Sequence, residues 1–180
     1  MKKLTRLFFA ALALVLALTL FGCAAAPAEP SPTAEPTPEP TPTPVPEVNV
    51  PVQDIADQLL AMEGMFPPAM DFMGEEMITE SCGLDFSLLD EYSLNDPMMN
   101  VHAHMLYIAK TKDEADVPAV EEAFRKRLEL MQDIFSTYLP AQYDLAMAGQ
   151  VVTNGKYVLM VVSNDSQAVV DEFNRLLTAE

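Results

Sequence analysis

The sequence predicts one α+β domain with a small, mainly antiparallel sheet of three to four strands packed by helices. Two β-rich runs joined by Asn154-Gly155 predict a hairpin over residues 150–163. A run of β-branched and aromatic residues predicts a strand near 101–110. Apolar residues at helical spacing predict helices near 51–64, 116–148 and 166–178.

The hairpin is the clearest local signal. Asn-Gly between β-rich runs favours a type I′ turn, which needs positive φ at both central positions. From Tyr157 to Val162 every residue is apolar, although alternate residues face opposite sides of a sheet. We therefore expect a central strand that is covered on both faces, or covered on one and sheltered on the other.

The helices are predicted from their ends as well as their spacing. Pro51 suits a first turn, Asp116 before Pro118 is a favourable start, and Asn164-Asp165 caps the last helix. In the second helix the apolar stripe comprises Val120, Phe124, Leu128, Met131, Phe135 and Tyr138. Pro140 breaks or kinks this helix.

Residues 66–97 show the poorest pattern, and their structure is not predicted. Met70, Met73 and Met77 are spaced to line a short helix interrupted by Gly74. Methionine fills irregular gaps, so these side chains, with Met62 and Met65, are interpreted as core filling. Leu84 to Leu89 is expected to pack a loop or a short helical turn against the core.

The N-terminus has the form of a secretory signal peptide over residues 1–22. A basic start, MKKLTR, precedes an apolar run from Leu7 to Gly22, shorter than the ~20 residues of a membrane-spanning helix. Leu20-Phe21-Gly22-Cys23 resembles a bacterial lipobox. The resemblance implies cleavage before Cys23 and its lipidation, which would anchor the chain through two acyl chains. The alternative is a plain signal peptide that ends near residues 24–26.

Residues 23–49 predict a disordered stalk. Between Pro27 and Pro46 nearly every second or third residue is proline, interleaved with Thr, Glu, Ala and Ser. Proline at this density prevents both helix and sheet and favours an extended polyproline-II spacer. At ~3.1 Å per residue the stalk could hold the domain, residues 50–180, up to ~80 Å from the bilayer.

The charge excludes some classes of partner. The whole chain has a formal charge of −17, and without residues 1–22 it has 7 basic against 27 acidic residues, or −20. Nucleic-acid binding needs a cationic surface, so it is not expected. Solubility is the simplest reason for the acidity, and cationic ligands are the functional one. Besides Cys23 only Cys82 remains, so no disulfide within the domain is expected, and Cys82 is interpreted as a small buried apolar residue.

Several features together resemble a known family. They are Tyr107 to Lys110, the helix with Ala123-Phe124 and Arg127, Tyr138-Leu139-Pro140, the Asn154 to Val158 turn, and Val169 to Leu177. They resemble a family of lipid-anchored Gram-positive proteins catalogued as domain of unknown function 4358. The similarity covers roughly Ile55 to Leu177 and is best from Met105 onward. It implies the fold and an envelope location, and it carries no catalytic residues.

Both histidines lie in the stretch MMNVHAHM, Met98 to Met105. On a strand His102 and His104 would share a face about 7 Å apart, where they could hold a soft metal ion together with Met98 or Met99. Met105 would point to the opposite face. Two ligands without a third are a weak motif, so no metal ligand, cofactor or catalytic residue is predicted.

The expected function is non-enzymatic binding by a monomeric domain at the outer face of the cell membrane. The partners expected are the membrane, through the lipid on Cys23, and an unknown envelope protein or small cationic ligand. One alternative is an extracytoplasmic soft-metal or cation binder that uses His102 and His104. The other is an envelope hydrolase without a recognisable motif, since no nucleophile elbow, phosphate loop or zinc-protease motif is present.

Overall fold

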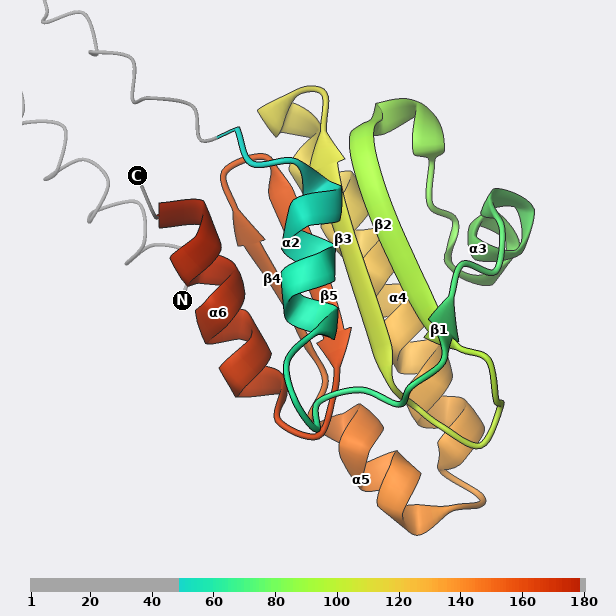
Figure 1. The fold of residues 1–180 in the computed structure, drawn as a ribbon. Helices are drawn as coiled ribbons and strands as arrows, with labels where there is room; N and C mark the ends of the chain where they lie inside the picture. Colours follow the sequence, from blue (N-terminus) through green and yellow to red (C-terminus); the bar gives the residue numbers. More distant parts are fainter. Residues whose placement is uncertain (1–48, 179–180) are drawn as a thin grey trace, which may run out of the picture. The chain divides into compact units, whose positions relative to one another are not determined.

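Five strands form one sheet in which neighbouring strands are antiparallel, in the order β1-β2-β3-β5-β4 (Figure 1). The computed structural model describes residues 49–178. The strands are β1 (Met70–Asp71), β2 (Leu89–Pro97), β3 (Met105–Thr111), β4 (Gln150–Asn154) and β5 (Tyr157–Val162). The predicted α+β class is confirmed, with five strands in place of three to four.

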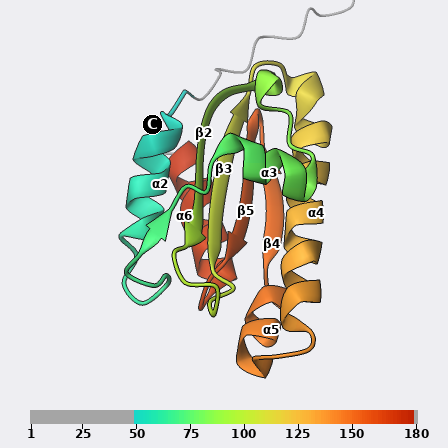
Figure 2. The same ribbon diagram turned by 90° about the vertical axis from the view of Figure 1, so that its right-hand side faces the viewer.

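Helices cover both faces of this sheet (Figure 2). They are α2 (Val52–Leu60), α3 (Glu75–Cys82), α4 (Val117–Phe135), α5 (Pro140–Met147) and α6 (Ser166–Thr178). Helices α2 and α6 lie on one face, and α3, α4 and α5 lie on the other (Figure 2). The sheet is therefore the middle of three layers.

The alternation of side chains along β3 and β5 builds two separate cores. Met105 and Tyr107 face α4, whereas Leu106 and Ile108 face α2 and α6. All six residues of β5 are buried, and they alternate between the same two cores. The central strand predicted from Tyr157 to Val162 is confirmed as one covered on both faces.

The two additional strands come from the segment whose structure the sequence pattern did not predict. Strand β2 pairs with β3, and the two-residue β1 pairs with the end of β2 through Met70 and Pro97. Acidic and other polar residues dominate β2, and these residue types disfavour strands in isolation. Its formation therefore rests on pairing with β3. Between α3 and β2, a 3₁₀ turn at Phe86–Leu88 provides the short helical turn expected there.

The hairpin is confirmed, but its turn differs from the expected type. Asn154 pairs with Tyr157, so the two loop residues are Gly155 and Lys156. Gly155 has φ +54°, and Leu139 is the sole non-glycine residue with positive φ in the described chain, so Lys156 has negative φ. Positive φ at the first central position alone is the pattern of a type II′ turn, not of type I′. The glycine is used, but one position earlier in the turn than predicted.

One predicted strand boundary needs correction, and a predicted helix break is confirmed. The strand expected near 101–110 begins at Met105, because residues 98–104 form a loop. The helix expected near 116–148 is divided into α4 and α5, so the predicted break at Pro140 is confirmed. Leu139 takes a left-handed conformation at φ +52°, which reverses the chain direction at this break. The helices near 51–64 and 166–178 are present as α2 and α6, and Asp165 caps α6 by accepting from the backbone N–H of Ala168 at 3.0 Å.

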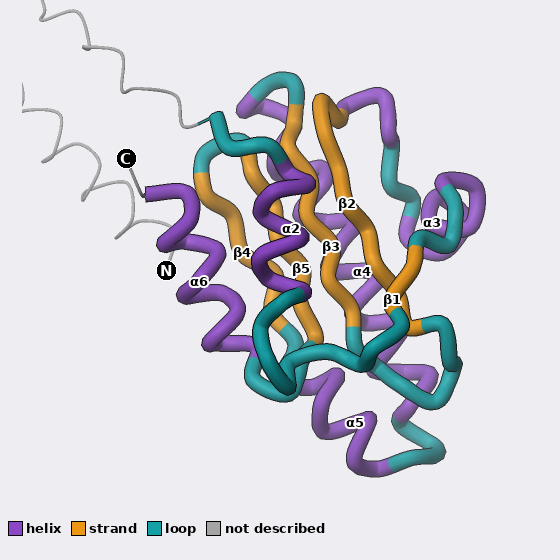
Figure 3. The backbone as a smooth tube through the Cα atoms, in the orientation of Figure 1, coloured by secondary structure: helices purple, strands orange, loops and turns teal. Residues whose placement is uncertain are grey.

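The connections at one end of the sheet come together next to α5 (Figure 3). The loop from α2 to β1 and the loop of residues 98–104 from β2 to β3 both lie there (Figure 3), and the Met98 N–H donates to the Ala69 carbonyl at 3.1 Å. The predicted signal peptide, Cys23 and the stalk up to residue 48 lie outside the described residues. Within residues 49–178 no helix has the length and apolar character needed to cross a bilayer.

Candidate functional site

A pocket of about 420 Å³ opens where the loop of residues 98–104 passes the C-terminal half of α4. Its apolar lining comprises Met73, Pro97, Met98, Met131, Ile134, Phe135 and Tyr138, and its polar lining comprises Asp96, Asn100, His102 and Arg127. This volume and this mixture of many apolar and few polar groups are typical of ligand sites. We call it the methionine pocket.

The base of the methionine pocket is a buried polar network. Arg127 on α4 donates from Nη2 to Asp96 Oδ1 at 2.8 Å and from Nε to the Tyr107 hydroxyl at 3.3 Å. That hydroxyl donates to Asp96 Oδ2 at 2.5 Å. The three residues come from α4, β2 and β3, so the network joins the helix to two strands. Both carboxylate oxygens of Asp96 are occupied.

The protonation of this network follows from its burial. Burial raises the pKa of the Tyr107 hydroxyl far above its ordinary value, and the adjacent Asp96 raises it further, so Tyr107 stays neutral. For Arg127 burial acts to lower the pKa, but Tyr107 and Asp96 outweigh that effect and hold it above its ordinary value. Arg127 is therefore a permanent cation whose charge is balanced by one carboxylate.

The rim of the methionine pocket is unusually apolar for a surface. Met98 is 69% exposed, and Met73, Ile134 and Tyr138 are between 41% and 44% exposed. The interpretation of Met73 and Met77 as core filling was wrong, because both side chains are exposed. Met62 and Met65 do pack against the core between α2 and α6, at its edge. Exposed apolar side chains gathered around a hollow mark an interaction site.

Backbone contacts hold the wall of the pocket in place. The Tyr138 hydroxyl donates to the Asn100 carbonyl at 3.3 Å, and the Tyr138 ring stacks on Phe135 with centroids 5.3 Å apart. The Ala103 N–H donates to Gln142 Oε1 of α5 at 2.9 Å. The loop of residues 98–104 is therefore fixed to the turn after α4 and to α5, so the pocket is largely formed before any ligand arrives.

His104 has a structural role. Its side chain is buried, and its Nε2 lies 3.3 Å from Asn164 Oδ1. Asn164 Nδ2 donates to the Gly64 carbonyl at 2.6 Å, so its Oδ1 is turned to accept from His104. Burial lowers the pKa of the imidazole and outweighs the Asn164 contact, so the ring is neutral near pH 7. His104 joins the start of β3 to the loops that follow α2 and β5.

The two histidines do not form the strand pair that the sequence suggested. Both precede β3, and their rings lie edge to face with centroids 5.8 Å apart. His104 contacts Asn164, whereas His102 lines the methionine pocket. Nδ1 of each ring is buried without a partner in the described chain. No group of three or more His, Cys, Asp or Glu side chains in residues 49–178 is arranged to hold a metal ion.

A comparison with family models gives one match. The model described as Domain of unknown function (DUF4358) matches residues 62–163, more than half of the chain. The chain belongs to this family. The resemblance predicted from the sequence is therefore confirmed. No curated protein and no solved structure matches the chain. The DUF4358 match includes β1 to β5 and the whole methionine pocket, and it leaves out α2 and α6.

Asp96 and Arg127 are the site residues that the sequence reasoning missed. Arg127 was noted only as part of the DUF4358 resemblance. It occupies a place on the apolar stripe of α4, three residues after Phe124 and four before Met131, and a charge at such a position signals a buried partner. Asp96 gave no comparable signal, because β2 itself was not predicted.

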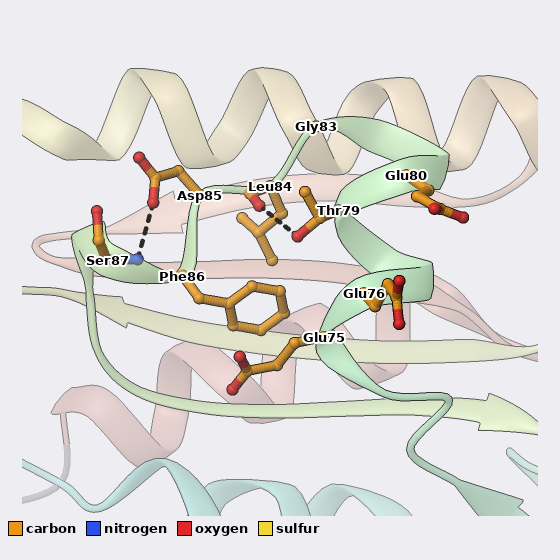
Figure 4. Close-up of a pocket in the computed structure, with 9 residues that line it drawn as sticks. All are labelled: Glu75, Glu76, Thr79, Glu80, Gly83, Leu84, Asp85, Phe86 and Ser87. Carbon is orange, nitrogen blue, oxygen red and sulfur yellow. Dashed lines mark hydrogen bonds between the residues drawn. The ribbon is translucent and has the colours of Figure 1, made fainter.

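A second hollow, of about 490 Å³, lies between α3 and the 3₁₀ turn (Figure 4). Its lining is acidic, with Glu75, Glu76, Glu80 and Asp85. Figure 4 shows the internal contacts that shape it: Asp85 accepts from the Ser87 N–H at 2.9 Å, and the Thr79 hydroxyl donates to the Leu84 carbonyl at 3.0 Å. These contacts close a helix end and a turn, so the hollow is interpreted as solvated acidic surface. Cys82 beside it is buried, as expected, and burial raises the pKa of its thiol.

Proposed function

We propose that this DUF4358 protein is a lipid-anchored binding module at the outer face of the cell membrane, and that it acts without catalysing a reaction. The observation that carries the proposal is the methionine pocket, with an exposed apolar rim and a wall fixed by α5 and by the turn after α4. At its base Asp96 and Tyr107 bond to each other and to Arg127, which suits a structural base better than acid-base chemistry.

The tether rests on the lipobox-like sequence at Cys23 and the proline-rich segment after it. We expect Cys23→Ala to release the protein from membranes into the medium, because the acyl chains are the anchor. Cell fractionation and immunoblotting measure this release. A variant that stays in the membrane fraction would show that the lipobox interpretation is wrong.

The binding role is tested by chemical crosslinking on intact cells, with the tethered chain as bait. Ile134→Asp places a carboxylate on the rim of the methionine pocket and should abolish specific crosslinks, because an unpaired charge is costly to bury. Met147→Asp is the matched control, since Met147 is 54% exposed on α5 and does not line the pocket. Equal crosslinks in both variants would exclude the methionine pocket as the binding surface.

A second candidate function is soft-metal binding. It is favoured by the position of His102, which lines the same pocket as the thioethers of Met73, Met98 and Met131. Imidazole and thioether ligands together suit Cu(I). Calorimetric titration with Cu(I), Zn²⁺ and Ca²⁺ tests it, with His102→Ala as the site variant and His104→Ala as its neighbour. No binding tighter than roughly 10 µM, or binding unchanged in the double variant, would exclude this function.

A further inference from the structure

Arg127 has hydrogen-bond donors that find no acceptor within residues 49–178. Its Nε and Nη2 bond to Tyr107 and Asp96, and Nη2 also lies 3.9 Å from the Met73 sulfur. Nη1 has no acceptor among the described residues. It is also not among the polar atoms that are both fully buried and without a partner, so it is accessible to a bound group. The side chain as a whole is only 9% exposed and lines the methionine pocket. Because the side chain lines the methionine pocket, we infer that Nη1 is available to a group bound there.

The charges at this point favour a neutral acceptor. Arg127 is already balanced by Asp96, whose two oxygens are both occupied. A carboxylate ligand would add a second negative charge beside Asp96 in a low-dielectric site, and like charges there repel strongly. A carbonyl oxygen accepts from Nη1 without that penalty. The apolar lining around it requires that the rest of the bound group be apolar.

The surface beyond the pocket favours a basic partner. Residues 49–178 contain 7 basic and 22 acidic residues. At least five of the basic residues are in ion pairs with carboxylates within the chain: Lys110, Arg125, Lys126, Arg127 and Arg175. The domain thus presents mostly acidic groups to solvent, and positive charge on a partner complements them and speeds its association.

We propose that the methionine pocket binds an apolar segment of an extended polypeptide with basic flanking residues, and that a backbone carbonyl of this segment accepts from Arg127 Nη1. The proposal rests on the binding role proposed above and names the ligand class of the same site. Methionine side chains adapt to differently shaped apolar groups. We therefore expect the pocket to select peptides by their apolar character and charge, and not by one particular sequence.

The test measures binding of fluorescent nonapeptides to the chain from residue 23 onward, made with Cys23→Ala so that it carries no lipid. This chain retains residues 49–178, which hold both cores. The probe has leucine and phenylalanine at its centre and two lysines at each end. Two control peptides replace the apolar centre by serines or the lysines by glutamates. We expect the probe to bind at least roughly tenfold more tightly than either control.

Variants locate the binding. Met98→Asp and Ile134→Asp change exposed side chains of the methionine pocket and should weaken the probe roughly tenfold or more, whereas Met147→Asp should leave it within about twofold. Thermal melts confirm that all three variants fold. The ¹⁵N–H signals of the Arg127 guanidinium should shift on adding the probe, and they should not shift with the serine peptide.

Two outcomes would overturn the peptide assignment. One is a probe that binds no more tightly than about 1 mM, or equally well to the Ile134→Asp variant. The other is binding of dodecanoate at the methionine pocket in preference to the probe, which would identify an organic acid as the ligand. The crosslinking experiment on intact cells tests the proposed binding role independently of these results. Failure of the peptide assignment can therefore be distinguished from failure of the binding role.

Discussion

Asp96 is the residue on which the base of the methionine pocket depends. It accepts from Arg127 and Tyr107, and all three side chains are buried. Asp96→Ala leaves a buried guanidinium without its counter-charge, a change that costs about 3–5 kcal/mol. Tyr107→Phe keeps the ion pair and leaves one carboxylate oxygen unpaired, so we expect a smaller loss of about 1–3 kcal/mol. Urea unfolding measures both, and equal losses would contradict the network.

His104 should make the stability of the domain depend on pH. Burial lowers its pKa below the ordinary value of 6.5, so below that pH the unfolded chain binds a proton more readily than the folded domain. The contribution of the neutral His104 ring to the free energy of unfolding is fully present above pH 6.5, and it is lost as the pH falls through the lowered pKa. The groups that face the ring are Asn164 and His102.

This pH dependence is measured as the change in the urea midpoint between pH 7.5 and 5.5, in wild type and in His104→Gln. We expect the change to be smaller in the variant, because glutamine does not titrate. His102→Gln is the control for a histidine in the same loop. A His104→Gln protein with the wild-type pH dependence would show that His104 does not carry it.

How far single residues are predictable depends on whether their surroundings are local in sequence. The capping role of Asp165 follows from the chain beside it and was predicted. Arg127 has its partners on β2 and β3, 31 and 20 residues away, so the sequence shows only an anomalous charge on an apolar stripe. His102 and His104 were expected on a strand, but the contact of His104 with Asn164, 60 residues away, holds it in a loop.

Gly149 shows how closely the elements are packed at the start of β4. A Cβ atom at this position would lie 2.6 Å from Leu128 Cδ1 of α4 and 2.8 Å from Val162 Cγ2 of β5. Gly149→Ala must therefore push the Leu128 and Val162 side chains out of their packed positions, and overpacking of this kind costs about 1–3 kcal/mol. Chemical denaturation measures the loss, and an unchanged midpoint would contradict the packing.

A double variant isolates the cause of that loss. Leu128→Ala removes the methyl group closest to the added Cβ and is itself destabilising, since Leu128 is buried. If the clash is the cause, Gly149→Ala with Leu128→Ala should be more stable than the sum of the two single losses by about 0.5–3 kcal/mol. Additive losses would indicate that the contacts with Val162 and the Ala146 carbonyl, and not the contact with Leu128, cause the loss.

Elements with a strong local pattern were predicted, and those held by neighbours were not. In the hairpin and in α6, the spacing of the apolar residues indicates the type of element, and turn or capping residues mark where it begins or ends. Strand β2 has neither: it contains four acidic residues or amides among nine and forms because β3 offers a pairing edge. The methionine pocket lies against β2 and the loop after it. The site could therefore not be assembled from the sequence, although the helix that forms its other wall could.

The whole domain needs both outer layers. Strands β3 and β5 bury alternate side chains on opposite faces, and α2 and α6 cover the face with Leu106, Ile108 and Leu159. The chain before α2 is also tied to the sheet: Asn49 accepts from the buried Lys110 at 2.6 Å, and the Val50 carbonyl accepts from the Tyr157 hydroxyl at 2.7 Å. The folding unit thus begins by residue 49, earlier than the DUF4358 match at residue 62.

A fragment limited to residues 62–163 should therefore not fold, although it contains the whole family match. Without α2 and α6 it exposes one entire face of the sheet, and each large apolar side chain left in water forgoes about 1.5–3 kcal/mol. The uncovered face includes five such residues of β3 and β5, so the loss is about 7.5–15 kcal/mol. This is as large as the roughly 5–15 kcal/mol that stabilises a typical domain. Circular dichroism and thermal melting should show a cooperative transition for residues 49–180 and none for 62–163. Fragments 49–163 and 62–180 each lack one of the two helices and should be soluble but much less stable than residues 49–180. A cooperative melt of 62–163 near the melting temperature of 49–180 would mean that the outer layer of α2 and α6 is dispensable.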